Sequence, residues 1–391
     1  YGVLLFQEDV LRIAVHFAGM SWIDADRFRK KVSDWTDLDD IEPDRQAFVA
    51  GAMRHVNATR EEAEGVFDAV KGFQGFGFAE SHAWAFAIHA YASGWLRVHY
   101  PAEYLAAILT EEPGMWSQST KRQEARAWGV PMLPLDVNAS GVHFRCERVR
   151  LDGGEPVKAV RPPLSAVAGI SEDVARQVLL ERLRHGAYSG VDDAHQRLPF
   201  AREQFEALVR AGAFDALQAR RDALFRVGAL SNAHASGERG LFTAVPETPG
   251  LAPLSLQEQY VWDYQTTRFS TLEIHALDFV RDQLHELDCV PLARLRRVPR
   301  KTRVRTAGLV VGKQRPPTAK GFAFYVLEDG PTRAQLIISP DLWESQRVLL
   351  RDASILVADA VVEDTGYQLT LKATALAELP APVRVRGYHF A

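Results

Sequence analysis

Cysteine is scarce in this sequence, which limits the kinds of fold and site that the chain can build. Of its 391 residues two are cysteines, Cys146 and Cys289. A disulfide framework or a cysteine-ligated metal cluster needs more thiols than this. The simpler interpretation is a protein of a reducing, cytoplasmic compartment, and we expect the chain to bind no metal and no cofactor of its own.

Long apolar segments are lacking as well. The most apolar stretch, residues 83–109, contains His89, Arg97 and Pro101, so it predicts no transmembrane helix and no membrane partner. The first six residues run directly into a Gln-Glu-Asp sequence and predict no signal peptide. Because the chain opens without an initiator methionine, we interpret it as part of a larger polypeptide.

An excess of charge of one sign is missing from the chain as a whole. It holds 46 Lys and Arg against 50 Asp and Glu, a formal net charge of −4, which favours no class of partner. The distribution says more, since residues 34–44 hold six acids and residues 294–305 hold seven cations and no acid. Such a basic run is typical of nucleic-acid contact, and equally of a solvated surface or linker.

Hydrophobic periodicity divides the chain into five parts. Helical spacing of apolar residues predicts a helical domain at 1–150, a second at 151–230 and a helical connector at 254–300, with a small, polar linker at 231–253. Residues 301–391 contain five short β-rich segments bounded by turn residues, at 304–311, 323–328, 334–339, 354–362 and 367–373. We therefore predict a multi-domain, mainly α-helical chain that ends in a small β-barrel.

A glycine-aromatic loop is the most distinctive motif. The sequence Phe-Gln-Gly-Phe-Gly-Phe begins at Phe73 and includes Gly75 and Gly77, and Ser81-His82 then opens a long helix. Backbone amides of such a loop can approach a phosphate, and the side chains of Ser81 and His82 add donors. Aromatic rings packed under a tight loop, with His82 as a cap, would explain the residues equally well.

Several motifs in order carry a family resemblance. The loop and Ser81-His82, followed by the Tyr-Ala-Ser-Gly-Trp run at 91–95 and the Asp-Val-Asn-Ala-Ser run at 136–140, resemble bacterial C-family DNA polymerases, the DNA polymerase III alpha subunit family. Glu80 before Ser81, and the ending at 386–390, are similar to the error-prone branch rather than the replicative one. The resemblance implies the C-terminal portion of such a polymerase, without its metallophosphoesterase-like N-terminal (PHP) and palm domains.

The resemblance assigns the helical domain at 1–150 to the fingers and little finger. Arg29 and Lys30 correspond to paired cations that contact the phosphates of the incoming nucleotide. Arginine grips a phosphate with two parallel hydrogen bonds, whereas lysine offers a point charge, so Lys30 is the weaker of the two. A solvated cationic helix face is the alternative. The predicted nucleotide-binding residues are Arg29, Lys30, Gly75, Gly77, Ser81 and His82.

Residues 151–230 resemble a tandem helix-hairpin-helix domain. An apolar helix, a Gly-Ile-Ser hairpin and a second helix follow one another from Leu164, and residues 205–217 resemble the partner unit. Hairpin amides and the following helix N-terminus bind the DNA backbone without reading its sequence. We predict contacts by Gly169, Ser171 and Gly212, with a simple pair of antiparallel helices as the alternative.

The β-rich tail resembles an OB-fold. Cations and aromatic rings together suit a groove for single-stranded DNA, which predicts DNA binding by Lys313, Arg315, Lys320, Phe324, Tyr325 and Arg333. Because side chains alternate along a strand, one of the two adjacent rings belongs in the core. In the linker, Leu241 and Phe242 lie where the replicative branch keeps a sliding-clamp-binding peptide, which implies a clamp contact.

The carboxylates of polymerase chemistry are not recognisable. The resemblance places an Asp-x-Asp pair and a third Asp, which hold two metal ions, in the palm. Here Asp24 and Asp26 lie on the cationic helix, and Asp192-Asp193 lies near a turn. We expect the isolated chain not to polymerise and Mg²⁺ to serve the complete polymerase.

The function implied is that of the C-terminal part of an error-prone DNA-directed DNA polymerase, used in translesion synthesis and damage-induced mutagenesis. The part would contact the incoming nucleotide, template-primer DNA and single-stranded DNA. A sliding clamp, a Y-family-like accessory protein and a RecA-like protein are further partners implied by the resemblance. The alternative is a non-catalytic DNA-binding scaffold module derived from such a polymerase.

Overall fold

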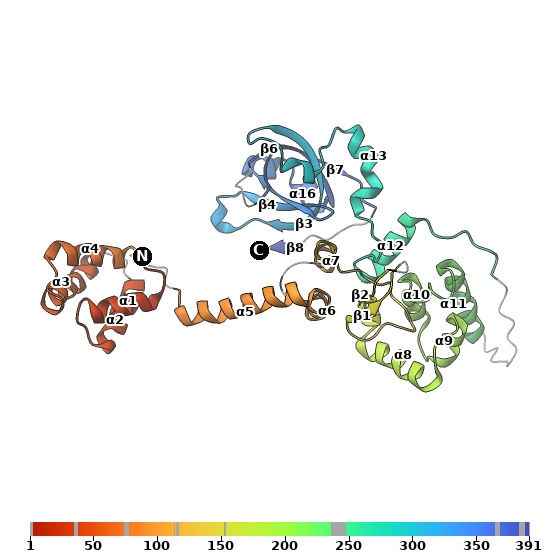
Figure 1. Ribbon diagram of the computed structural model, residues 1–391. Coiled ribbons are helices and arrows are strands. Elements are labelled where there is room, and N and C mark those ends of the chain that lie inside the picture. Colours follow the sequence, from red (N-terminus) through yellow and green to blue (C-terminus); the bar gives the residue numbers. More distant parts are fainter. Residues whose placement is uncertain are drawn as a thin grey trace. The chain divides into compact units, whose positions relative to one another are not determined.

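The computed structural model describes residues 3–34, 38–73, 78–112, 114, 117–151, 154–235, 248–363, 368–382 and 388–390. Its contacts divide the chain into two compact units, Tyr1–His99 and Tyr100–Ala391 (Figure 1). The division falls inside the domain expected at 1–150. Among the described residues no helix is both long and apolar enough to cross a membrane.

The first unit is helical. Its helices are α1 (Gln7–His16), α2 (Trp22–Asp34), α3 (Leu38–His55), α4 (Arg60–Lys71) and α5 (Glu80–His99). The first four pack around a cluster of phenylalanines, with the ring of Phe48 stacked on Phe28 at 5.6 Å between centroids and edge-on to Phe67 at 5.5 Å. Thr59 caps α4 because its hydroxyl accepts from the amide of Glu62, whose carboxylate accepts from the amide of Thr59.

Helix α5 differs from the other four because none of its residues is buried. Figure 1 shows it extending from the four-helix bundle. Its large side chains stand in solvent, with Trp84, Phe86 and Tyr91 exposing 64%, 60% and 77% of their surface. A helix with this much apolar surface is typical of a protein interior rather than of a free surface.

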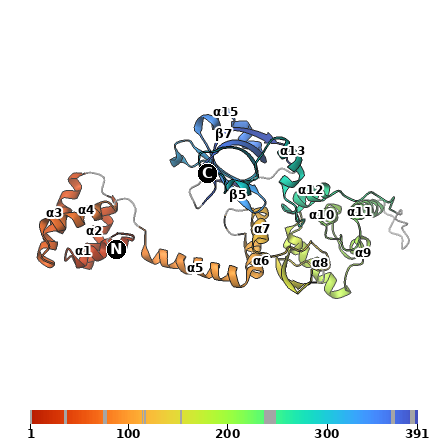
Figure 2. The ribbon, with the colours of Figure 1, turned by 45° about the horizontal axis from the view of Figure 1, so that its top comes forward.

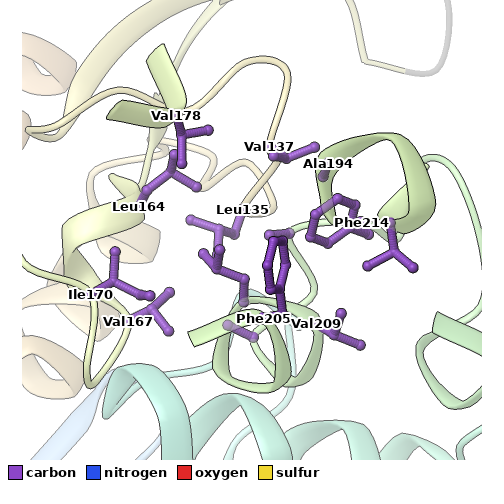
Figure 3. Packing of buried hydrophobic residues seen from close by; sticks show 14 of the residues in the cluster. Leu135, Val137, Leu164, Val167, Ile170, Val178, Ala194, Phe205, Val209 and Phe214 are labelled. Atoms are coloured by element: carbon purple, nitrogen blue, oxygen red, sulfur yellow. The ribbon is translucent and has the colours of Figure 1, made fainter. Parts of the chain in front are cut away.

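The second unit begins with a helical part. Its elements are α6 (Pro101–Glu111), α7 (Gln118–Ala127), β1 (Arg145–Val149), β2 (Val157–Arg161), η1 (Leu164–Ala166), α8 (Glu172–His185), α9 (Val191–Arg197), α10 (Arg202–Arg210) and α11 (Arg220–Ala235). The strands β1 and β2 form an antiparallel hairpin. Figure 3 shows Phe205 near the centre of the core of this part, with Leu135, Val209 and Phe214 around it. Complete burial of such a ring contributes about 2 kcal/mol or more to folding.

A connector leads to the final domain. It contains α12 (Leu256–Thr267), η2 (Ala276–Val280), α13 (Arg281–Glu286) and α14 (Leu292–Leu295). Ser255 caps α12 by accepting from the amide of Glu258. Tyr260 of α12 and Leu277 of η2 pack in one buried cluster with Leu309 and Val357 of the barrel that follows.

The final domain is a closed five-stranded barrel. Its elements are β3 (Arg303–Gln314), η3 (Pro317–Ala319), β4 (Ala323–Asp329), β5 (Thr332–Ile338), α15 (Pro340–Ser345), α16 (Arg347–Asp352), β6 (Ile355–Val362) and β7 (Thr370–Leu379), and a short β8 (Tyr388–Phe390) pairs with β3. The strands are hydrogen-bonded in the order β3-β4-β5-β7-β6-β3, with β5 and β7 parallel. Figure 2 shows the strands curving round into a barrel.

One strand closes the barrel by pairing on both sides. The first half of β3 pairs with β6, its second half pairs with β4, and the register shifts between Val310 and Gly312. At Gly308 a Cβ would lie 2.6 Å from Cβ of Leu327, so only glycine fits this crossing. The prediction of a mainly helical chain followed by an OB-fold barrel is confirmed.

Candidate nucleic-acid interface

The two cations predicted on the fingers helix share one carboxylate. Arg29 donates to Asp26 Oδ1 from Nε at 3.1 Å and from Nη2 at 2.9 Å, and Lys30 Nζ lies 2.8 Å from Asp26 Oδ2. The hydrogen bond from Lys30, followed by that from Arg29, lowers the pKa of Asp26. Asp26 is therefore the common partner of both cations.

Arg29 is also held by α1. Its Nη1 donates to Gln7 Oε1 at 2.8 Å, and the backbone amide of Gln7 donates to the carbonyl of Phe78 at 3.0 Å. Gln7 thus links α2 to the residues that lead into α5. Sequence reasoning missed this residue, since a glutamine in a first helical turn carries no signal of a contact 22 positions away.

The start of α5 lies beside the start of α1. Ser81 and His82 are exposed, and the His82 ring stands between Phe78 at 5.1 Å and Phe86 at 4.4 Å. The first backbone amide of the helix already has an acceptor within the chain, because Glu80 N donates to Glu8 Oε2 at 2.8 Å. The two predicted glycines of the preceding loop, Gly75 and Gly77, lie outside the described residues.

The predicted hairpin before α8 is present and exposed. Gly169 adopts a φ of +87° with no atom within 4 Å of an added Cβ, and Ile170, next in the turn, is buried. Ser171 accepts from the amide of Val174 and so caps α8. Gly169 and Ser171 are therefore brought together at an exposed turn.

The first turn of α8 carries both signs of charge. Arg176 donates to Glu172 at 2.7 Å and to Asp173 at 2.8 Å. These acids lie at the positive end of the helix dipole, and Arg176 offsets part of their charge.

Gly212, predicted as a DNA contact, lies in the interior rather than at the surface. It is buried with a φ of +83°, and an added Cβ would clash with Nη2 of Arg220. Arg220 is 7% exposed and pairs with Asp215 at 2.8 Å and Asp263 at 2.6 Å. The glycine is thus required to make room for a buried cation, and this role is structural.

Two of the residues predicted to bind single-stranded DNA are inside the barrel. Tyr325 is 1% exposed and its hydroxyl donates to the carbonyl of Leu350 at 2.9 Å. Lys313 is 6% exposed, and its Nζ donates to the carbonyls of Leu350 and Arg351, each at 2.8 Å. Burial lowers the pKa of Lys313 and raises that of Tyr325. We therefore do not retain Lys313 and Tyr325 as contact residues.

On the outer face of the barrel, Arg333 forms ion pairs with two glutamates. Its guanidinium donates to Glu328 at 3.0 Å and to Glu124 of α7 at 2.6 Å. A helix therefore covers part of the surface that was predicted to bind DNA. Phe324 is the ring of the pair that stays partly exposed.

Two of the predicted barrel residues lie in the loop between β3 and β4. Arg315 stacks over the Trp343 ring at 4.9 Å and donates to Glu344 at 3.3 Å, and Lys320 has a φ of 49°. The predicted clamp-contact residues, Leu241 and Phe242, lie outside the part of the chain that the structure describes.

Comparison with known proteins matches two segments of the chain to described families and nearly the whole chain to curated relatives. Residues 1–56 match the family described as the finger domain of the bacterial DNA polymerase III alpha subunit, and residues 129–224 match the helix-hairpin-helix motif. Error-prone DNA polymerases are similar throughout. That of Burkholderia pseudomallei is 36% identical over 92% of this chain, and that of Mycolicibacterium paratuberculosis is 33% identical over 100%. The chain spans about a third of the length of these relatives, 34% and 35% respectively.

Proposed function

This chain is homologous over its whole length to the C-terminal portion of bacterial error-prone DNA polymerases, and we propose that it holds the nucleotide and the DNA for such a polymerase. The observation that supports the proposal most strongly is the sequence similarity to these polymerases over nearly the whole chain. The chain would contact the incoming deoxynucleoside triphosphate through α2 and the start of α5, and the DNA backbone through the hairpin before α8.

The arrangement of the first unit supports the nucleotide contact. Arg29 is held by Gln7 and Asp26, so its guanidinium is oriented before a ligand arrives. Exchange of the single carboxylate of Asp26 for a triphosphate gives Arg29 and Lys30 a partner of greater charge. Preorganised cations of this kind bind with less loss of side-chain freedom.

The chemistry of nucleotide transfer needs a metal site that this chain does not present in its described part. Two-metal catalysis requires carboxylates gathered around Mg²⁺, and the described residues contain no group of three or more His, Cys, Asp or Glu that could hold a metal ion. We propose that the carboxylates come from the palm, outside this chain, so no catalytic step is assigned to it.

Helix α5 supports a larger assembly. Its exposed Trp84, Phe86 and Tyr91 form an apolar surface that water covers unfavourably. We propose that another part of the polymerase covers this surface in the complete enzyme.

An alternative function is a DNA-binding scaffold without a role in nucleotide transfer. The pairing of both Arg29 and Lys30 with Asp26 favours it, because one carboxylate already partners both cations and offsets half of their charge. The two functions differ in nucleotide binding, which only the first requires.

Primer extension tests the proposal. We expect the purified chain with Mg²⁺ and nucleotides to extend no primer, and extension to appear when a polypeptide carrying the palm of a related error-prone polymerase is added. Omission of this chain from the mixture is the control. Robust incorporation by the chain alone would refute the proposal.

A further inference from the structure

A group of exposed cations lies in the segment that leads from α14 of the connector into the first barrel strand, β3. We call these six residues the arginine ridge: Arg294, Arg296, Arg297, Arg300, Lys301 and Arg303. All six are exposed, and none of them has an ion pair or a side-chain hydrogen bond with a residue that the structure describes. The seventh cation of the run, Arg305, is instead paired with Asp359 at 2.7 Å.

The ridge is anchored by apolar residues at its beginning. Leu292 and Leu295 are completely buried in the barrel core. Backbone hydrogen bonds fix the end of the ridge, since Lys301 N donates to Val362 O at 2.8 Å and Val362 N donates to Thr302 O at 3.0 Å. The basic run is therefore an ordered surface of the barrel rather than a flexible linker.

Three acids on neighbouring segments, Asp359, Asp329 and Asp288, form no ion pair with the ridge. Asp359 forms an ion pair with Arg305, and Asp329 forms one with Arg281. Asp288 lines a cavity with Arg303, Arg305 and Asp359, and forms no ion pair with a described residue. Six like charges within ten residues repel one another, by up to about 1 kcal/mol for a close pair in water. A bound polyanion would remove this repulsion.

Two other regions of the barrel surface are covered by parts of the chain itself. Leu309 of β3 and Val357 of β6 are covered by the connector, and Arg333 of β5 is held by Glu124 of α7. A strand of DNA on these faces would have to displace parts of the chain itself. The ridge requires no such displacement.

From these observations we infer that the arginine ridge binds the phosphodiester backbone of DNA without reading its sequence, an inference that rests on the proposed function. The run at 294–305 contains no aromatic ring on which bases could stack, and its guanidinium groups match phosphate geometry. The same chemistry serves a single strand and a duplex. The ridge would be a second contact, separate from the hairpin before α8.

Salt-dependent binding of the full chain to DNA tests the inference. The test variant combines Arg296→Gln, Arg297→Gln and Arg300→Gln, which removes three exposed charges and keeps long polar side chains. The control variant combines Arg347→Gln, Arg351→Gln and Lys372→Gln, three exposed cations of the barrel outside the ridge. Fluorescence anisotropy would follow mixed-sequence single-stranded and duplex oligonucleotides over a range of salt, and thermal melting would verify folding.

We expect the ridge variant to lose about tenfold or more in affinity at low salt, and its log–log salt slope to fall by about 2 for a single strand. The control variant should stay within about twofold of the natural chain. A loss confined to one form of DNA would support the inference and identify that form as the ligand. Natural affinity and slope in the ridge variant, for both forms, would overturn it.

The same measurement separates this inference from the proposed function. If the natural chain binds DNA and the ridge variant binds it equally well, the ridge has no role in DNA binding and the proposed function stands. If the natural chain binds neither form of DNA, both fail.

Discussion

Arg29 donates a hydrogen bond from Nη1 to Gln7 Oε1 at 2.8 Å, and this contact joins α2 to α1. Through its backbone amide Gln7 also reaches Phe78, just before α5. Three helices thereby meet at the residues proposed to hold a nucleotide. The guanidinium is fixed by two partners, whereas Lys30 has Asp26 and is 65% exposed.

Arg29→Ala should therefore weaken nucleotide binding more than Lys30→Ala. Loss of a charge-assisted, bidentate phosphate contact costs about 1.5–3 kcal/mol, or roughly tenfold to a hundredfold in affinity. Isothermal titration of a deoxynucleoside triphosphate into the full chain measures both variants. Arg60→Ala on α4, an exposed cation paired with Glu64, is the control. Equal affinities for Arg29→Ala and the natural chain would favour the scaffold function.

Asp26 should titrate at a lower pH than an ordinary aspartate. Hydrogen bonds from Lys30 and Arg29 lower its pKa below 3.8. The stability that this pairing contributes is present above the unfolded-state value and is lost as the pH falls through the lower folded-state value. Carbon-detected NMR of the Asp26 carboxyl group measures the midpoint.

The double variant Arg29→Gln/Lys30→Gln should move that midpoint back towards 3.8. Glu62 is an internal control, because its pKa is lowered by the backbone and hydroxyl of Thr59 instead. A midpoint for Asp26 that does not respond to the double variant would show that the pairing is absent in solution.

Gly212→Ala and Gly169→Ala should separate a structural glycine from an exposed one. Both positions have positive φ, which costs alanine about 1–2 kcal/mol. At Gly212 the new Cβ also meets Arg220, which cannot move away because Asp215 and Asp263 hold it. Chemical denaturation should show a loss larger than about 2 kcal/mol for Gly212→Ala and a smaller one for Gly169→Ala. Equal losses would contradict the close approach to Arg220.

Lys313→Met should destabilise the barrel without changing DNA binding. The substitution removes the Lys313 donor from the carbonyl of Arg351 and leaves that of Leu350 with the Tyr325 hydroxyl alone, at a cost of about 1–3 kcal/mol. Lys320→Met, in the exposed loop, should keep the stability and lower the affinity for single-stranded DNA. Thermal melting and anisotropy measure the two effects. A selective loss of DNA affinity in a stable Lys313→Met chain would restore Lys313 as a contact residue.

Much of the fold could be predicted from local patterns, because alternation and turn residues mark strands within a few positions. The five barrel segments were found in this way. The roles of individual side chains were harder to predict from the sequence, because they depend on partners far away along the chain. The choice between Phe324 and Tyr325 depends on which face of β4 meets the core. The sequence marks Gly212 as a position that requires glycine, but the structural cause is the buried guanidinium of Arg220 beside it.

The candidate site depends on still longer-range contacts. Arg220 pairs with Asp263, 43 positions away, and Gln7 joins Arg29, 22 positions away. Sequence spacing carries no signal for either pair, and the family resemblance names the cations but not what holds them. The basic run illustrates the converse, because its composition was evident and only the structure shows it as an ordered surface.

The central claim, that this chain holds DNA while the metal chemistry takes place elsewhere, is tested most directly by its binding to a primed DNA template. Anisotropy of the full chain with labelled template-primer would be measured over a range of salt, with and without a chelator of divalent ions. The account predicts tight binding at low salt, a log–log slope steeper than about −3, and no effect of the chelator. A flat slope, or binding that disappears with the chelator, would contradict it.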